Sequence, residues 1–327
     1  MNPAVSVIIP VYNGEKTIGR CLDSLFAQTL QQLEIIVVDD GSTDQTLPLL
    51  KRYQNSRLLV LHQENSGQGC ARNAGLMAAH APYVGFVDAD DTVDPHMYEA
   101  MLYRARQTGA DVVQCNLLDI EADGRADIQL PVWEAVVDRV DPHTYFGDYM
   151  LTNRHSYEVC NKLFLRSFLK TCGLRFYPNH LVYAEDLLFN MQLAGKRPCI
   201  AFMKEAYYHY YQHEDSHARQ YTAEKIEQLY HLFETFEYNE VDPKIVRNAS
   251  QIAVLVLMQN IARFLECTSD MSAASMLLRR RALRRYLWYA VLEMKKLRHK
   301  ALMLYLLCLP VRLRVPMLRF YYLNMAQ

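Results

Sequence analysis

Short β-branched runs alternate with amphipathic stretches between residues 5 and 118, and this alternation most constrains the fold. Apolar runs of strand length occur at Val5–Pro10, Leu33–Val38, Leu58–Leu61, Tyr83–Val87 and Asp111–Leu118. Stretches with helical spacing of apolar residues separate them, at Thr17–Thr29, Asp44–Tyr53, Gly69–Ala79 and Pro95–Thr108. Strand–helix alternation favours a doubly wound, mostly parallel sheet with right-handed crossovers. The sequence therefore predicts an α/β fold for this part of the chain.

The strand pattern disappears from about Thr222, and the rest of the chain is helix-like. Helices are expected at Ala223–Phe236, Pro243–Glu266, Ser272–Arg298 and Ala301–Leu323. A chain of 327 residues fits two parts, because a single core stops growing near ~250–300 residues. We predict an α/β domain over residues 1–221 and a helical region over residues 222–327. Between Gly124 and Asn153 the pattern is irregular, which leaves room for an inserted region.

The composition is that of a globular protein. Hydrophobic residues make up 51% of the chain and charged residues 22%, which excludes a disordered or low-complexity protein. The segment Met1–Ser6 lacks the features of a secretory leader, so a cytoplasmic location is expected. The eight cysteines form no C-x-x-C pair, which favours scattered reduced thiols over disulfides or a zinc knuckle.

Positive charge is concentrated at the end of the chain. Residues 279–327 hold twelve Lys and Arg residues against the single Glu293, although the whole chain has a net charge of −1. The longest apolar run in this tail, Ala301–Val311, is well short of the ~20 residues that span a bilayer. We expect the tail to lie on an anionic membrane surface. A solvated helical bundle packed on the body is the alternative; nucleic acid is not expected, since no recognised binding module accompanies the charge.

The sequence contains three acidic clusters, two of which follow predicted strands. They lie at Asp39-Asp40, at Asp88-Ala89-Asp90-Asp91 and, later in the chain, at Glu185-Asp186. In doubly wound sheets, ligands bind beyond the carboxyl ends of the strands. Converging carboxylates repel one another unless a cation neutralises them, and hard oxygen ligands favour Mn²⁺ or Mg²⁺ held together with substrate phosphates. For Asp91 and Asp94, capping of the following helix is the alternative.

Four segments resemble, in order, the motifs of the inverting family 2 glycosyltransferases with the GT-A fold. They are Val5–Asn13, Val37–Asp44, Ala71–Gly75 and Val87–Asp91. The resemblance continues more weakly through Cys160–Phe164 and Ala184–Phe189 to Tyr210–Ser216. It covers roughly residues 4–217 and implies a GT-A sheet followed by a helical, basic C-terminal region.

The resemblance also implies residues that hold the donor nucleotide. Pro10, Tyr12 and Asn13 would flank the nucleotide, and Asp39 would accept a hydrogen bond from the uracil or the ribose. Arg72 would lie near the nucleotide and hold Asp88 or a phosphate; an exposed helix face is the alternative for this arginine.

The metal ligands and phosphate contacts follow in the same way. Asp88 and Asp90 would form the D-x-D pair, with Asp90 as the main ligand of Mn²⁺ or Mg²⁺. Lys162 would bind a phosphate or, alternatively, only cover a helix. His213 would contact the pyrophosphate or the metal. The literal zinc-protease pattern His213–His217 is not expected to bind zinc, because it follows an aromatic run of strand character rather than lying on a helix.

The pair Glu185-Asp186 resembles the position of the family's catalytic base. Asp186 would take the proton of the acceptor hydroxyl, with Glu185 supporting it. A carboxylate pair favoured by the helix macrodipole is the alternative.

The expected activity is transfer of one sugar, with inversion, from a nucleotide-diphosphate donor to a saccharide or lipid-linked acceptor. A UDP-sugar is the expected donor. Synthesis of a bacterial cell-surface polysaccharide or lipopolysaccharide at the cytoplasmic face of the membrane fits this picture. The alternative is a non-catalytic, membrane-bound partner of a glycan-assembly complex that retains the fold. The sugar, the linkage and the oligomeric state stay open.

Overall fold

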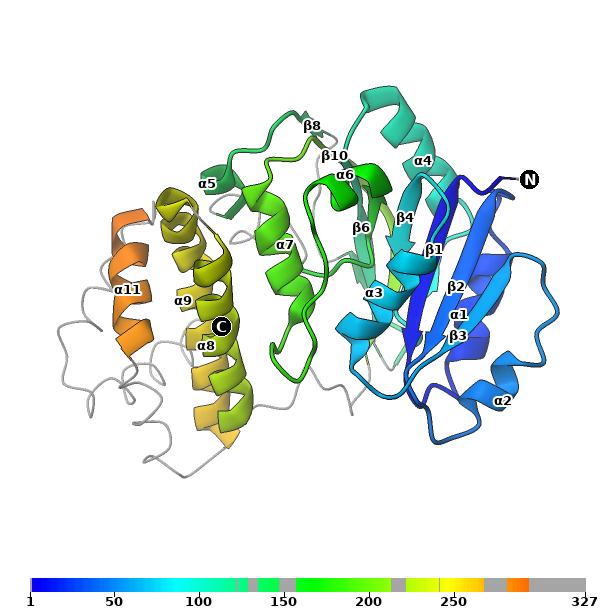
Figure 1. Ribbon diagram of the computed structural model, residues 1–327, viewed down its shortest axis with the longest axis horizontal. Coiled ribbons are helices and arrows are strands. Elements are labelled where there is room, and N and C mark those ends of the chain that lie inside the picture. The colour runs from blue at the N-terminus through cyan, green and yellow to red at the C-terminus, as the bar shows by residue number, and fades with distance from the viewer. Residues whose placement is uncertain are drawn as a thin grey trace. The chain divides into compact units, whose positions relative to one another are not determined.

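The computed structural model describes residues 2–121, 123–128, 135–146, 157–212, 222–240, 242–267 and 281–293. The chain forms two compact units (Figure 1). The first consists of Met1–Val140, Ser156–His180 and Glu185–His213, and the second of Asp141–His155, Leu181–Ala184 and Glu214–Gln327. The domain boundary at residue 221 stays a prediction.

A ten-stranded sheet runs through the described part of the first unit. Its strands are β1 (Val5–Val11), β2 (Leu33–Asp39), β3 (Leu58–His62), β4 (Tyr83–Phe86), β5 (Thr92–Val93), β6 (Val112–Ile120), β7 (Ala126–Ile128), β8 (Ala135–Val137), β9 (Lys162–Leu165) and β10 (Ile200–Tyr211). The order is β3-β2-β1-β4-β9-β6-β10-β5, with β7 beside β6 and β8 beside β10. Strands β3, β2, β1 and β4 pair in parallel, as do β6 and β10. The mostly parallel α/β fold is thus confirmed.

Strand β9 departs from this parallel pattern. It lies between β4 and β6 and runs antiparallel to both. The strand–helix alternation did not predict this insertion, because β9 comes late in the chain and its partners lie far away in sequence. Its consequence is that the segment before β9, starting at Tyr157, reaches the middle of the sheet.

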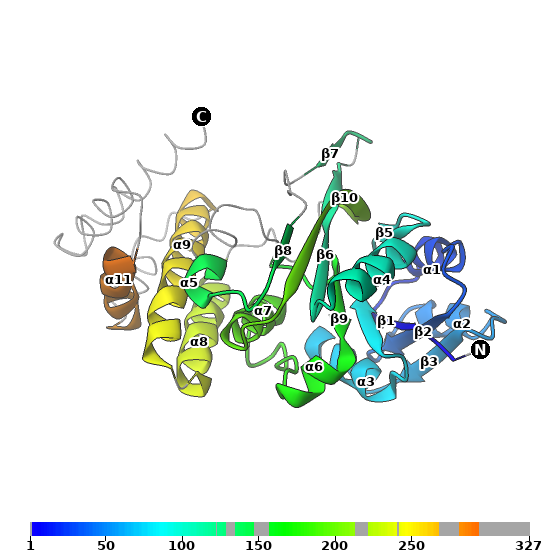
Figure 2. The same cartoon turned by 90° about the horizontal axis from the view of Figure 1, so that it is seen from above.

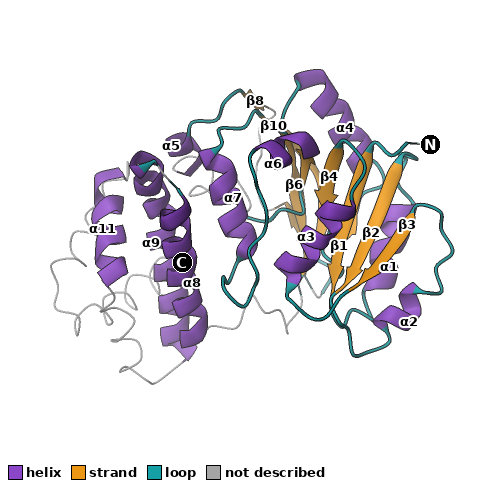
Figure 3. Ribbon diagram, viewed as in Figure 1, coloured by secondary structure: helices purple, strands orange, loops and turns teal. Residues whose placement is uncertain are grey.

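Helices cover both faces of the sheet (Figures 2 and 3). In this unit they are α1 (Ile18–Phe26), α2 (Thr46–Leu50), α3 (Gln68–Ala78), α4 (Met97–Thr108), α6 (Arg166–Thr171) and α7 (Glu185–Gly195). Every residue of β1 is buried, as expected for a parallel strand covered on two sides. Val5, Val7 and Ile9 pack in one cluster with α1 and α4, whereas Ile8 faces α3, where a Cβ on Gly75 would come within 2.3 Å of it.

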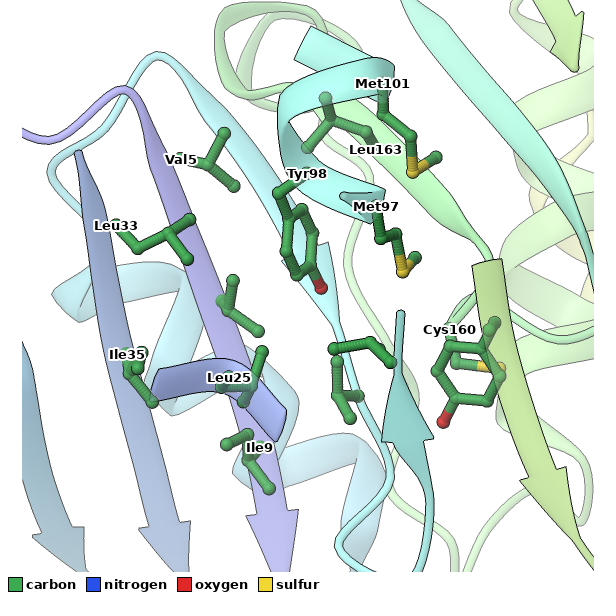
Figure 4. Packing of buried hydrophobic residues seen from close by; sticks show 14 of the residues in the cluster. Val5, Ile9, Leu25, Leu33, Ile35, Met97, Tyr98, Met101, Cys160 and Leu163 are labelled. Carbon is green, nitrogen blue, oxygen red and sulfur yellow. The ribbon is translucent and has the colours of Figure 1, made fainter. Parts of the chain in front are cut away.

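The main apolar core lies between the sheet and helices α1 and α4 (Figure 4). Tyr98 of α4 is fully buried there, with Leu25 and Met97 in the same cluster. Burying a side chain of this size contributes roughly 1.5–3 kcal/mol. A Cβ on Gly85 of β4 would lie 2.7 Å from the Tyr98 ring, so the close approach of this helix requires glycine. The core fixes the strands whose carboxyl ends carry the acidic clusters.

The described helices of the second unit are α5 (Pro142–Thr144), α8 (Ala223–Asn239), α9 (Pro243–Cys267) and α11 (Arg281–Glu293). Helix α11, which lies within the basic tail, packs against α8 and α9 through Leu283, Tyr286 and Leu287. The expected helix Ala301–Leu323 lies outside the described residues. None of the described helices combines the length and the apolar character that crossing a bilayer demands.

Candidate active site

The loops after β1 and β2 are joined by Asn13. Its φ of 52° places it in the left-handed region, which asparagine tolerates better than most residues. Its Oδ1 accepts a hydrogen bond from the Thr43 backbone N at 2.8 Å, and its own N donates to Ser42 Oγ at 2.9 Å. Tyr12 is half exposed beside it, whereas Pro10 is buried within β1. The two loops thus form one rigid edge of the site.

Asp39, the last residue of β2, is fully buried. Its Oδ2 is hydrogen-bonded to Nδ1 of His62 at 2.7 Å, while its Oδ1 has no hydrogen-bond partner among the described residues. A buried acceptor without a donor is costly, so the site offers Oδ1 to a ligand N–H or O–H. The neighbouring Asp40 instead orders the loop before α3, by accepting hydrogen bonds from the backbone N of Ser66 and of Gly67.

The predicted metal pair begins at Asp88, two residues after the end of β4. Its Oδ1 accepts hydrogen bonds from Gln68 Nε2 at 3.0 Å and Arg72 Nη2 at 2.9 Å. Asp90 is held through its backbone carbonyl, which accepts a hydrogen bond from the Arg20 guanidinium. The two carboxylates therefore lie on a loop that is fixed at both positions.

A metal ion would find hard oxygen donors at this loop. Within the described ranges, no group of three or more His, Cys, Asp and Glu side chains gathers to hold a metal. Two carboxylates are what Mn²⁺ or Mg²⁺ uses when substrate phosphates complete its coordination. The donor set of Asp88 and Asp90 fits that kind of shared site.

Asp91 has a structural role that the sequence did not reveal. It is buried and does not cap a helix: Oδ2 accepts a hydrogen bond from the Tyr208 hydroxyl at 2.7 Å, and Oδ1 accepts one from the Tyr211 backbone N at 2.9 Å. The Tyr208 oxygen also accepts a hydrogen bond from the Asp88 backbone N at 3.1 Å. Burial and the charges of Asp90 and Asp88 raise the pKa of Asp91. Asp91 thus anchors the loop that carries Asp88 and Asp90 to β10.

Arg72 and Glu185 form a buried ion pair. Arg72 Nη1 lies 2.5 Å from Glu185 Oε1, and both side chains are almost fully buried, so the arginine is not on an exposed helix face. Desolvation alone would lower the Arg72 pKa, but the carboxylates of Asp88 and Glu185 outweigh it and raise that pKa. Asn179 completes the arrangement, donating to Glu185 Oε2 at 2.7 Å and accepting from the Gly69 backbone N at 2.7 Å. Nothing in the local sequence marks Asn179; only the tertiary structure does.

Asp186 follows this pair on the first turn of α7. It is half-buried, and its Oδ1 accepts a hydrogen bond from the Leu187 backbone N at 2.8 Å. Burial and the neighbouring charge of Glu185 raise the pKa of Asp186 to about 7, against the opposing effect of Arg72. Just before the helix, Ala184 has a φ of 61°, a strained conformation for alanine that is typical of functional sites.

Lys162 is buried on β9 and therefore does not cover a helix surface. Its Nζ donates to the Glu158 carbonyl and to Asn161 Oδ1, the latter at 3.0 Å. Burial lowers the Lys162 pKa to about 8, even though the charges of Glu158 and Asp186 act in the opposite direction. His213, the remaining predicted contact, lies outside the described residues.

Comparison with known proteins identifies the family of this chain. The sequence model of Glycosyl transferase family 2 matches residues 6–173. EpsH of Bacillus subtilis, which is named as a glycosyltransferase, is 32% identical over 236 residues, covering 71% of this chain and 68% of EpsH.

Two solved structures share the fold. S. aureus TarS 1–349 in complex with UDP-GlcNAc gives a TM-score of 0.73 at 22% identity and covers 100% of this chain and 93% of that one. The mannosyltransferase PcManGT from Pyrobaculum calidifontis, in complex with GDP-Man and Mn²⁺, gives a TM-score of 0.54 at 18% identity over 98% and 88% of the two chains. Because the family match spans more than half of the sequence and the sheet is that of the GT-A fold, this chain belongs to glycosyl transferase family 2.

Proposed function

We propose that this chain is an inverting glycosyltransferase that moves a sugar from a UDP-sugar to a hydroxyl group of a saccharide or lipid-linked acceptor. The observation that carries the proposal is the buried guanidinium of Arg72. Its Nη2 holds the metal-pair residue Asp88, and its Nη1 holds Glu185, the neighbour of Asp186. The Arg72 side chain thus links the donor side of the site to the segment that carries the proposed base, Asp186.

The donor would be held by Asp39 and by the metal pair. The unpartnered Oδ1 of Asp39 suits an N–H group of the uracil ring. Asp88 and Asp90 would hold Mn²⁺ or Mg²⁺, which when bound supplies positive charge to the diphosphate leaving group. TarS, which was solved with UDP-GlcNAc, and PcManGT, solved with GDP-Man and Mn²⁺, support a nucleotide-sugar donor.

Asp186 would act as the base toward the acceptor. A general base works best when its pKa lies near the working pH, and the raised pKa of about 7 meets this condition. Asp186 takes the proton of the acceptor hydroxyl while that oxygen attacks the anomeric carbon. In such a direct displacement, the base and the leaving diphosphate lie on opposite sides of the sugar ring, which inverts the configuration.

We place the reaction in cell-surface glycan synthesis at the cytoplasmic face of a membrane. The support comes from the basic tail, of which α11 exposes Arg284 and Trp288. A cationic and aromatic face of this kind suits the interface of an anionic membrane. We also propose that Lys162 and His213 contact the donor phosphates.

A donor panel tests the proposal. UDP- and GDP-sugars are incubated with Mn²⁺ and a set of saccharide and lipid-linked acceptors, and release of the nucleoside diphosphate is measured. We expect turnover with a UDP-sugar, loss of activity with EDTA and loss in Asp90→Ala. The exposed Asp127→Ala serves as a matched control and should keep full activity. Absence of turnover with every donor, together with binding of a glycan-assembly protein, would favour the non-catalytic partner instead.

A further inference from the structure

We propose that Lys162 and Glu158 are positioning residues for Asp186, with the lysine favouring its ionised form and the glutamate opposing it. The inference rests on the proposed function of Asp186 as a base. It assigns a further task to Lys162, which is also proposed to contact the donor phosphates, and a first task to Glu158.

Asn190 ties the segment that carries these charges to the base. Its Nδ2 donates to the Tyr157 carbonyl at 2.6 Å and to the Asp186 carbonyl at 3.0 Å. The side chain is fully buried on α7, one turn after Asp186. The segment starting at Tyr157 is therefore fixed against the first turn of α7.

Lys162 is anchored within the same segment. Its ammonium group is buried and donates to the Glu158 carbonyl and to Asn161 Oδ1. Asn161 is itself held by a hydrogen bond from its Nδ2 to the Cys115 carbonyl of β6 at 2.9 Å. A fully buried lysine is rare, because desolvation of its charge is costly. This anchoring keeps the charge at a fixed place instead of letting it reach water.

Glu158 carries a carboxyl group on the same segment. Its Oε2 is buried and has no hydrogen-bond partner in the part of the chain that the structure describes. The charged groups around Asp186 are then Glu185 on its own helix, Arg72 on α3, and Glu158 and Lys162 on the segment before and within β9. Two cations and two carboxylates surround the base. Arg72 and Glu185 also act on Asp186, but they hold each other and Asp88, so Lys162 and Glu158 are the charges that can be removed without breaking that ion pair.

Two substitutions test this by their opposite signs. Lys162→Met removes the positive charge at similar side-chain size, and Glu158→Gln removes the negative charge at the same shape. A nearby positive charge lowers the pKa of a carboxyl group, and a nearby negative charge raises it. The acid limb of the pH profile of kcat/KM should therefore move to higher pH in Lys162→Met and to lower pH in Glu158→Gln. Lys170→Met and Glu99→Gln, at exposed positions, are the matched controls and should leave the limb in place.

A second measurement does not need turnover. The unfolding midpoint is measured as a function of pH for each variant and for the same variant carrying Asp186→Asn. The difference between the two curves reports the proton bound by Asp186. The upper pH limit of the range in which the two midpoints differ should rise in Lys162→Met and fall in Glu158→Gln. If Lys162→Met does not fold, Glu158→Gln decides alone.

The outcomes separate this inference from the proposed function. Opposite shifts in the two variants support it. Unchanged windows, or shifts of the same sign, overturn it even if the chain transfers sugar and Asp186→Asn is inactive. Full activity of Asp186→Asn would instead overturn the role of the base, while the midpoint measurement would still report on the two charges.

Discussion

At the scale of single residues, the ionisation of Asp186 sets an expected pH dependence. Its pKa is raised to about 7, so the carboxylate that accepts a proton is formed as the pH rises through that value. The value of kcat/KM should rise between pH 6 and 8. Asp186→Asn should lower turnover by roughly 10²–10⁴-fold with donor KM nearly unchanged. An active Asp186→Asn together with an inactive Glu185→Gln would show that the roles are reversed.

The same residue affects stability with a definite sign. The folded protein holds a proton on Asp186 up to about pH 7, whereas the unfolded chain releases it near 3.8. The unfolded state thus binds fewer protons between these values, and the free energy of unfolding should fall as the pH rises through this window. Asp186→Asn should remove that part of the dependence. Urea unfolding of both proteins between pH 4 and 8 measures it, and parallel curves would contradict the raised pKa.

His62 offers a second prediction, for donor affinity. It holds Oδ2 of the buried Asp39 at 2.7 Å, so His62→Ala frees the carboxylate that we propose to bind the nucleotide. Loss of a hydrogen bond to a charged group should raise donor KM about tenfold, with kcat nearly unchanged. His80→Ala is the control, since His80 makes a similar 2.8 Å contact with Glu34 at the start of β2, far from the site end of the strand. Equal effects of the two substitutions would refute the assignment.

At the scale of elements, the loop that carries Asp88 and Asp90 depends on β10. Tyr208→Phe removes the hydroxyl that donates to Asp91 and accepts from the Asp88 backbone N. Loss of this buried contact should lower the free energy of unfolding by about 1–3 kcal/mol and weaken the stabilisation by Mn²⁺ with UDP. Tyr103→Phe, at an exposed position on α4, should change neither. Thermal unfolding with and without the ligands measures both effects; an unchanged ligand shift would show that β10 does not hold the loop.

At the scale of the whole molecule, the basic tail should bring the protein to anionic lipid. Because Leu283 and Leu287 of α11 are buried in the second unit, point substitutions at exposed residues are a cleaner test than removal of residues 279–327. Each basic residue near an anionic surface contributes about 1 kcal/mol, so Arg284→Gln should weaken liposome binding about fivefold. The exposed Lys51→Gln of the first unit is the control.

Sedimentation with vesicles checks this expectation. The full chain should bind anionic vesicles more strongly than neutral ones, and high salt should weaken the binding without abolishing it, since apolar contacts are not screened. Equal binding to both kinds of vesicle would show that the basic residues are not the anchor. Absence of binding would support the alternative that the tail forms a solvated helical bundle. The packing of α11 against α8 and α9 is part of such a bundle.

The sequence by itself determined the α/β class and the strand ends at Asp39 and Asp88, because alternation and turn chemistry are local properties of the chain. It also marked Glu185-Asp186 through the family resemblance. Only the tertiary structure joined Arg72 to Glu185, 113 residues apart, and Asp91 to Tyr208, 117 residues apart. It likewise inserted β9 into the sheet and buried Lys162 on that strand. Local sequence cannot predict such pairs, because burial and electrostatics depend on which distant segments the folded core brings together.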